Sequence, residues 1–133
     1  MPPTDRSNSA DWYTLDKDLT VQDRGTVSLG RALEIFDGVL SRLQPAYASG
    51  EEALAETMFG FSRGSGNFVE LCVHTTDHVN CQIELPGPSR LGGSLFARRF
   101  EWNRDVRPDE ARRLLSDFFD LSPEDLRRAL EAR

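Results

Sequence analysis

The sequence has few of the residues on which covalent cross-links and metal sites usually depend. Its 133 residues include two cysteines, two histidines and a single lysine, Lys17. The opening stretch MPPTDRSNSA lacks the apolar core of an export signal. No later stretch approaches the ~18 apolar residues that span a membrane. We therefore expect a cytoplasmic protein whose two cysteines are reduced thiols, since disulfides are rare in that compartment.

Familiar catalytic motifs are missing as well. The sequence contains no nucleophile elbow, no phosphate-binding lysine motif and no helical zinc-binding motif. The glycines of Gly64-Ser65-Gly66 stand between two strand-like segments, whereas a phosphate-binding loop joins a strand to a helix. We expect no cofactor and no metal, and the balance favours a protein that is not an enzyme.

The charge is acidic but unevenly spread. The net charge is −6; residues 1–89 carry six basic and thirteen acidic side chains, whereas residues 90–113 carry seven arginines and four acids. An acidic majority argues against nucleic acid as a partner, because phosphate binding needs a concentrated positive surface. For residues 90–113 we favour arginines paired with neighbouring acids, namely Glu101, Asp105, Asp109 and Glu110. Anion binding, with Arg98 among aromatic residues, is the alternative.

Helical periodicity is clear in two segments. Residues 28–43 place their apolar side chains on one side at 100° per residue, with Ser28 as the cap and Pro45 as the end of the helix. Residues 108–119 repeat this pattern, and Ser122 caps a short final helix. Residues 1–10 have no periodicity and are predicted to be a flexible tail, which leaves residues 11–133 as a single domain.

Strand patterns occupy the middle of the chain. Residues 57–63 alternate, residues 69–85 form two apolar runs around a polar loop, and residues 94–102 alternate around aromatic side chains. Residues 11–21 are a further short strand or an ordered loop. The predicted fold is α+β, with a three- to four-stranded antiparallel sheet, two amphipathic helices on one face and a short C-terminal helix.

The segment Val69–Leu85 poses the main functional question, because it contains both cysteines and both histidines. Zinc needs about four converging ligands. A hairpin with a loop at residues 75–77 instead buries Val79, Ile83 and Cys81 and turns Cys72 outward. Since burial of the apolar set should decide the register, the sequence predicts a hairpin and no metal site at Cys72, His74, His78 and Cys81.

Two groups of polar residues are candidate partner-binding positions. Glu70, His74, His78 and Glu84 should share the outward face of the predicted hairpin. Glu34 and Asp37 should lie on the polar side of the first helix. Acidic residues at such positions would steer association with a basic protein.

The order of a helix, the strand pair NFVELCVHTTDHVNCQIEL, the aromatic strand FARRFEW and the helix EARRLLSDFF resembles small acidic bacterial immunity proteins of contact-dependent and type VI toxin systems. That resemblance implies a non-enzymatic domain that binds a cognate toxin. Three alternatives stay open: a secretion-chaperone-like effector binder, a small-molecule-binding or enzymatic domain that uses the His74 and His78 face, and a structural or oligomeric module. The expected partner is another protein, a basic toxin or effector, or a second copy in a homodimer.

Overall fold

The computed structural model describes residues 9–15, 18, 20–49, 58–64, 66–74, 77–86 and 99–133, with the side chains of residues 43–49 left out of the description. Within these residues the chain forms six strands and three helices. The strands are β1 (Ser9–Leu15), β2 (Val21–Ser28), β3 (Met58–Ser62), β4 (Phe68–Val73), β5 (Val79–Leu85) and β6 (Phe100–Val106). The helices are α2 (Leu29–Ser49), α3 (Pro108–Asp120) and α4 (Pro123–Glu131).

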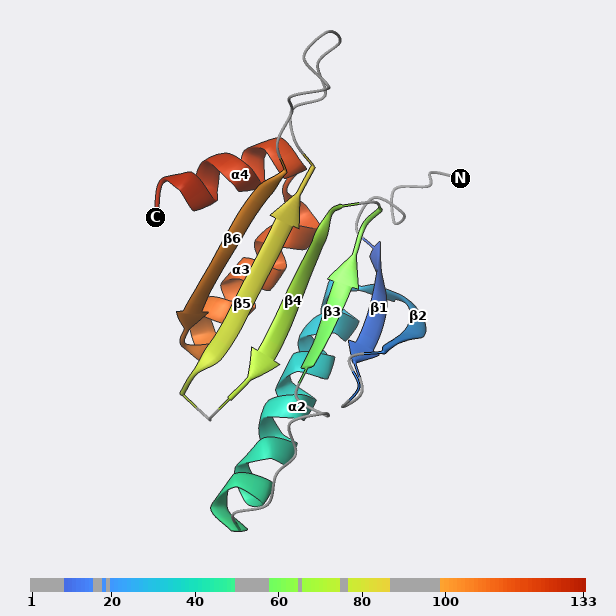
Figure 1. Ribbon diagram of the computed structural model, residues 1–133, viewed down its shortest axis with the longest axis vertical. Coiled ribbons are helices and arrows are strands. Elements are labelled where there is room, and N and C mark those ends of the chain that lie inside the picture. The colour runs from blue at the N-terminus through green and yellow to red at the C-terminus, as the bar shows by residue number, and fades with distance from the viewer. Residues whose placement is uncertain are drawn as a thin grey trace, which may run out of the picture.

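The six strands form one antiparallel sheet in the order β2-β1-β3-β4-β5-β6, as Figure 1 shows. The predicted α+β class is confirmed, but the prediction of three to four strands is wrong. Strand β2 was missed because almost all of its side chains are exposed, so its sequence carries no alternation of apolar and polar residues. Strand β1 includes Ser9 and Ala10, which were assigned to the tail; residues 1–8 lie outside the described part.

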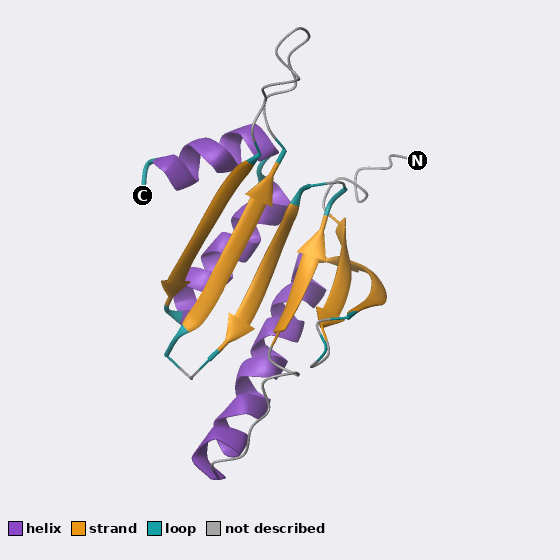
Figure 2. Cartoon of the chain, in the orientation of Figure 1, coloured by secondary structure: helices purple, strands orange, loops and turns teal. Residues whose placement is uncertain are grey.

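The helices lie behind the sheet in Figure 1, and Figure 2 separates the helical layer from the strands by colour. Along β4 and β5 fully buried residues alternate with half-buried ones, and the core contains the apolar residues of the covered face and of the helices. Its largest fully buried side chains include Phe36, Phe59, Phe61, Phe118 and Phe119. Among the helices that the structure describes, none combines the length and apolar character needed to span a membrane.

Serine side chains cap the starts of α2 and α4. The Ser28 hydroxyl accepts a hydrogen bond from the Arg31 amide at 3.3 Å, and the Ser122 hydroxyl accepts one from the Asp125 amide at 3.1 Å. Both predicted N-terminal caps are therefore confirmed. The predicted stop at Pro45 is wrong, because α2 continues to Ser49. A proline removes one hydrogen bond of a helix, and this is not always enough to end it.

The last strand lies later in the chain than predicted. Strand β6 extends from Phe100 to Val106, whereas the aromatic pattern predicted residues 94–102. Positions 94–98 lie outside the described residues, so the structure does not test them. Trp102 and Val106 are buried on the covered face, whereas Arg104, which lies between them on the same side of the strand, is exposed.

Arg63, in the turn between β3 and β4, attaches the sheet to the end of α3. Its Nη1 donates to the carbonyl oxygens of Phe118 at 2.9 Å and Phe119 at 3.1 Å. The last carbonyls of a helix have no partner within the helix, so this contact satisfies two of them. The same turn contains Gly64 and Gly66 at φ 111° and 69°, a conformation that favours glycine.

Candidate functional site

The hairpin of β4 and β5 adopts the predicted register. Leu71 lies opposite Cys81 and Cys72 lies opposite Asn80, and the His74 amide donates to the His78 carbonyl oxygen at 3.0 Å. Cys81 is fully buried on the covered face, whereas Cys72 is half-buried on the other. The two thiols therefore lie on opposite faces of the sheet and cannot converge on one ion with the histidines. In the described part of the chain, no cluster of three or more potential ligands is suited to hold a metal ion.

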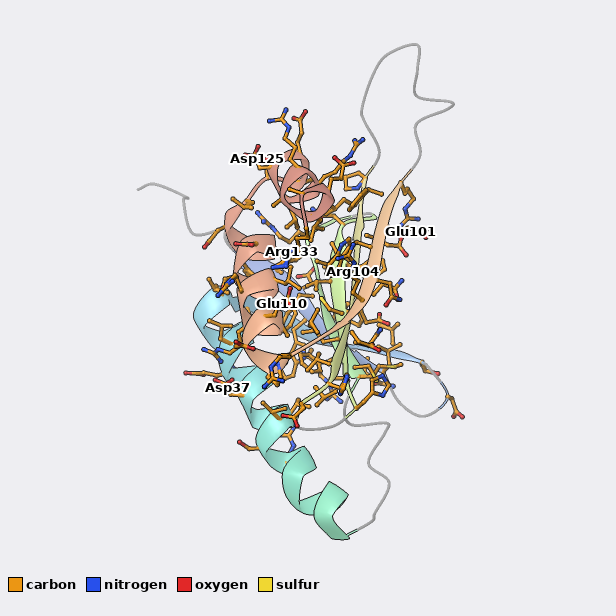
Figure 3. The ribbon with its side chains drawn as sticks, turned by 90° about the vertical axis from the view of Figure 1, so that its left-hand side faces the viewer. Asp37, Glu101, Arg104, Glu110, Asp125 and Arg133 are labelled. Carbon is orange, nitrogen blue, oxygen red and sulfur yellow. The ribbon has the colours of Figure 1, made fainter. Side chains whose placement is uncertain are left out.

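The Cys81 thiol lies in an environment that keeps it protonated. Burial raises its pKa to about 12; the negative charge of Glu110 adds to this shift and the positive charge of Arg133 opposes it. Figure 3 shows Glu110 and Arg133 near each other beside the sheet, where they form an ion pair of 2.5 Å. Only a deprotonated thiol acts as a nucleophile or a metal ligand. The protonated Cys81 therefore serves as an apolar residue of the core.

This buried thiol predicts a loss of stability at alkaline pH. The folded-state pKa of Cys81 is raised above its ordinary value of 9.0, so the unfolded chain releases the proton first. The contribution of the protonated Cys81 thiol to the stability of the fold is complete below about pH 9 and is lost as the pH rises toward about 12. Between pH 8 and pH 10 the free energy of unfolding should fall by about 1 kcal/mol from this group.

Urea unfolding of wild type and Cys81→Ala across this pH range measures the effect. The alanine variant should start from a lower stability and show a shallower fall. Ile83→Val is the matched control, since it removes core volume without removing a thiol, and its pH slope should equal that of wild type. Identical slopes for wild type and Cys81→Ala would contradict the prediction.

The opposite face of the sheet is not covered by the described helices and carries an acidic surface. Residues that pair across neighbouring antiparallel strands point to the same side, so the register identifies its members. We call this surface the open face. The described paired positions of this face carry six carboxylates from five strands: Asp11, Asp23, Glu70, Glu84, Glu101 and Asp105. None of the described paired positions on the open face carries a lysine or arginine.

Glu70 and Glu84 lie on the open face as predicted, but both are held by other side chains. The Tyr13 hydroxyl donates to Glu70 Oε1 at 2.9 Å. Arg99 Nη2 lies 2.5 Å from Glu84 Oε1, and the side chain of Glu84 is only 15% exposed. These two carboxylates therefore contribute to the structure of the sheet as well as to its charge.

Tyr13 reaches from β1 across β3 to Glu70 on β4. Its ring lies directly over Gly60, where the β-carbon of any other residue would collide with it. Burial is the main cause that raises the pKa of the Tyr13 hydroxyl, and the charge of Glu70 and the hydrogen bond to it act in the same direction. The hydroxyl therefore remains a neutral donor for the carboxylate throughout the physiological pH range.

The carboxylates of β6 were not among the predicted binding residues. Glu101 lies opposite Glu84, and Asp105 lies opposite Asn80, whose amide group donates to it at 3.0 Å. Both acids are exposed. The predicted strand ended at residue 102 and so left out Asp105, whereas Glu101 lay inside it; both acids were interpreted as ion-pair partners of neighbouring arginines. Val106, at even spacing from Phe100 and Trp102, was the available signal for the longer strand.

Glu34 and Asp37 are separated from the open face. Both lie on α2, and Figure 3 shows Asp37 on the helical side of the molecule. Glu34 forms an ion pair with Arg31 at 3.2 Å, and Asp37 accepts a hydrogen bond from Arg112 of α3. The six predicted binding residues thus fall on two opposite sides, and Asp37 has a role in joining two helices.

His74 and His78 lie at the end of the hairpin and are exposed. Thr75 and Thr76, which belong to the predicted loop, lie outside the described residues. The hydrogen bond between the two backbones closes the hairpin end, as the sequence predicts.

The arginines of residues 90–113 have different partners from those predicted. Arg99 pairs with Glu84, Arg112 contacts Asp37, and Arg104 stacks on the ring of Trp102, with its guanidinium carbon 5.4 Å from the centroid. Arg90 and Arg98 lie outside the described residues. Arg99 and Arg112 thus contact acids that are distant in sequence, whereas Arg104 contacts an aromatic ring of its own strand.

An open hollow of about 440 Å³ lies at one end of β1, β2 and β3. Its lining residues are Ser9, Ala10, Asp11, Thr26, Ser62, Arg63 and Gly64. Asp11 accepts a hydrogen bond from the Thr26 hydroxyl at 2.9 Å, and Arg63 holds the end of α3. The charged groups of this hollow therefore take part in contacts that stabilise the fold.

No protein-family model, no curated protein and no solved structure matches this chain.

Proposed function

We propose that this protein binds a basic protein through the open face of its sheet and acts without turnover of a substrate. One observation supports this proposal above the others: helices cover one side of the sheet, and the other side presents six carboxylates and no paired lysine or arginine among the described positions. Arg99 pairs with Glu84 on this face, and the other described carboxylates keep the face predominantly acidic. A surface on which one sign of charge predominates steers a partner of opposite charge and accelerates association.

The open face also has the apolar contacts that a stable interface needs. Tyr13, Met58, Phe68 and Cys72 point to this side and are half-buried, so they form a partly exposed apolar centre between the acids. Protein interfaces commonly combine an apolar, aromatic centre with a polar rim. The geometry therefore favours a macromolecular partner over a small molecule, for which a concave pocket would be expected.

The resemblance to toxin-neutralising immunity proteins extends the proposal to a biological role. Many toxins that act on nucleic acid or nucleotides have a basic active-site surface, and an acidic blocker would cover it. An effector-binding chaperone would use the same surface. Co-expression with the partner separates the two roles, because an immunity protein should remove the toxicity of its partner.

Charge reversal on the open face tests the binding proposal. The variant Glu101→Lys with Asp105→Lys leaves Glu70 and Glu84, which have structural partners, untouched. The matched control is Glu34→Lys with Asp120→Lys on the helical side, which changes the net charge by the same amount. Wild type and both variants are immobilised and exposed to a lysate of the native organism, and bound proteins are quantified by mass spectrometry.

A basic protein should be retained by wild type and by the helix-side variant and lost by the open-face variant. Its association rate should fall with increasing ionic strength, because salt screens charges on the surface. Retention that depends on the helix-side acids would contradict the proposal. If the captured protein is toxic when expressed alone, co-expression of this chain should remove the toxicity, and persistent toxicity would contradict the immunity role.

A further inference from the structure

Strand β6 forms a regular edge of the sheet. The described strands end with β6 on one side and β2 on the other. Strand β6 pairs with β5 over seven consecutive positions without irregularity, whereas the pairing of β1 with β2 is interrupted by a bulge at Trp12 and Tyr13. Bulges distort an edge and oppose the addition of a further strand. Figure 1 shows β6 at the left margin of the sheet, with α4 near its upper end.

The backbone groups on this edge follow from the hydrogen-bond pattern. In an antiparallel ladder, directly opposed residues alternate between pairs that exchange hydrogen bonds and pairs that do not. The His74 amide bonds to His78, so Asn80, Gln82 and Glu84 direct their backbone toward β4.

The intervening residues of β5 direct their backbone toward β6, where their partners are Phe100, Trp102, Arg104 and Val106. The alternate residues Glu101, Asn103 and Asp105 therefore direct their amide and carbonyl groups to the open edge.

These three residues also direct their side chains to the open face. Within the described part of the chain no strand pairs with the outer side of β6, so the free backbone groups and the carboxylates of Glu101 and Asp105 belong to the same residues. An antiparallel strand added to this edge would place alternate side chains opposite Glu101, Asn103 and Asp105. Lysine or arginine at those alternate positions would complement the two carboxylates, and the strand would satisfy the edge hydrogen bonds.

A second copy of the chain complements this edge poorly. If two β6 strands paired antiparallel about Asn103, Glu101 of one copy would lie opposite Asp105 of the other, twice in each dimer. Like charges directly opposite one another destabilise a strand pair. The charges therefore favour a basic occupant over self-association.

We infer that the β6 edge binds an extended basic segment of the partner protein by antiparallel strand addition, with its basic residues on the open face. This inference rests on the proposed function, because the added strand would belong to the basic partner that the open face is proposed to bind. Main-chain hydrogen bonds would provide affinity, and the alternating charge would provide selectivity.

Synthetic peptides test the inference without knowledge of the partner. The probe is a fluorescent peptide of the sequence Thr-Lys-Thr-Lys-Thr-Lys-Thr, which matches the seven residues of β6. One control has the lysines in a block, Thr-Thr-Lys-Lys-Lys-Thr-Thr, with the same charge. Two others carry N-methyl groups either on the three lysine amides, which would face β6, or on three threonine amides, which would face away.

The alternating peptide and its threonine-methylated form should bind more tightly than the block peptide. Methylation of the lysine amides should weaken binding about tenfold or more, because it removes the edge hydrogen bonds. The amides of Glu101, Asn103 and Asp105 should gain protection from hydrogen exchange in the complex. Binding should weaken in the variant Glu101→Lys with Asp105→Lys and persist in Glu34→Lys with Asp120→Lys.

Equal affinity of the two methylated peptides, absence of protection at the three amides, or absence of binding by the alternating peptide would each overturn strand addition. The proposed function is judged separately by the charge-reversal capture of the natural partner. A partner lost on open-face reversal but without protection at the β6 amides would support the binding function and reject this mode of binding.

Discussion

Phe61→Ala is expected to lower the free energy of unfolding by about 3–5 kcal/mol, the usual cost of truncating a buried phenylalanine. Phe61 is fully buried on the covered face of β3. Its ring lies 5.9 Å from that of Phe59 and 5.8 Å from that of Phe119, measured between centroids. The truncation would therefore remove both an aromatic contact within the strand and the contact that joins the sheet to α3.

Chemical denaturation measures this loss, and Phe100→Ala provides the matched control. Phe100 is only partly buried at the edge of the sheet, so the same truncation there should cost clearly less. If both variants lost the same stability, the aromatic cluster would not be the centre of the core.

Gly60→Ala should destabilise the protein by roughly 2–3 kcal/mol, at the upper end of the usual range for overpacking. A methyl group at Gly60 would come within 2.9 Å of Tyr13 Cε1 and closer still to Cζ and the hydroxyl oxygen. The ring could avoid the methyl group only by leaving Gly60, which would break its hydrogen bond to Glu70. Loss of the hydrogen bond between Tyr13 and Glu70 would also remove a contact between β1 and β4, which are distant in sequence.

A double-mutant cycle with Tyr13→Ala tests this explanation. Once the ring is absent, Gly60→Ala should cost much less, so the two substitutions should be strongly non-additive. Additive losses would show that the cost of Gly60→Ala has another origin. Gly30→Ala is the matched control, because a methyl group at this helical position would meet only the Ser28 hydroxyl, at 4.0 Å. Gly25→Ala is unsuitable because Gly25 has a positive φ, which strains any other residue.

The local elements of this protein could be predicted from its sequence where one side of an element is buried. The hairpin register follows from the alternation around Val79 and Ile83, because a shift of one residue would expose the whole apolar set. The α3 helix follows from its apolar stripe, and α4 from its cap at Ser122. In these segments burial and local hydrogen bonding favour the same conformation.

The size of the sheet could not be predicted in this way. Strand β2 is exposed along most of its length, so its formation depends on the pairing with β1 rather than on a pattern in its own side chains. The length of α2 was underestimated for a related reason, since the Pro45 signal is local and did not determine where the helix ends.

For the candidate site, the sequence by itself determined that Glu70 and Glu84 share a face and that Cys72 and Cys81 do not, since side chains alternate along a strand. Only the tertiary structure decided that Tyr13 and Arg99 hold the two glutamates, that Asp37 joins the helices, and that β6 lies at the edge of the sheet. The physical reason is that alternation is a local property of the backbone, whereas strand order and ion-pair partners depend on contacts between residues far apart in the chain, for which a single sequence contains no periodic signal.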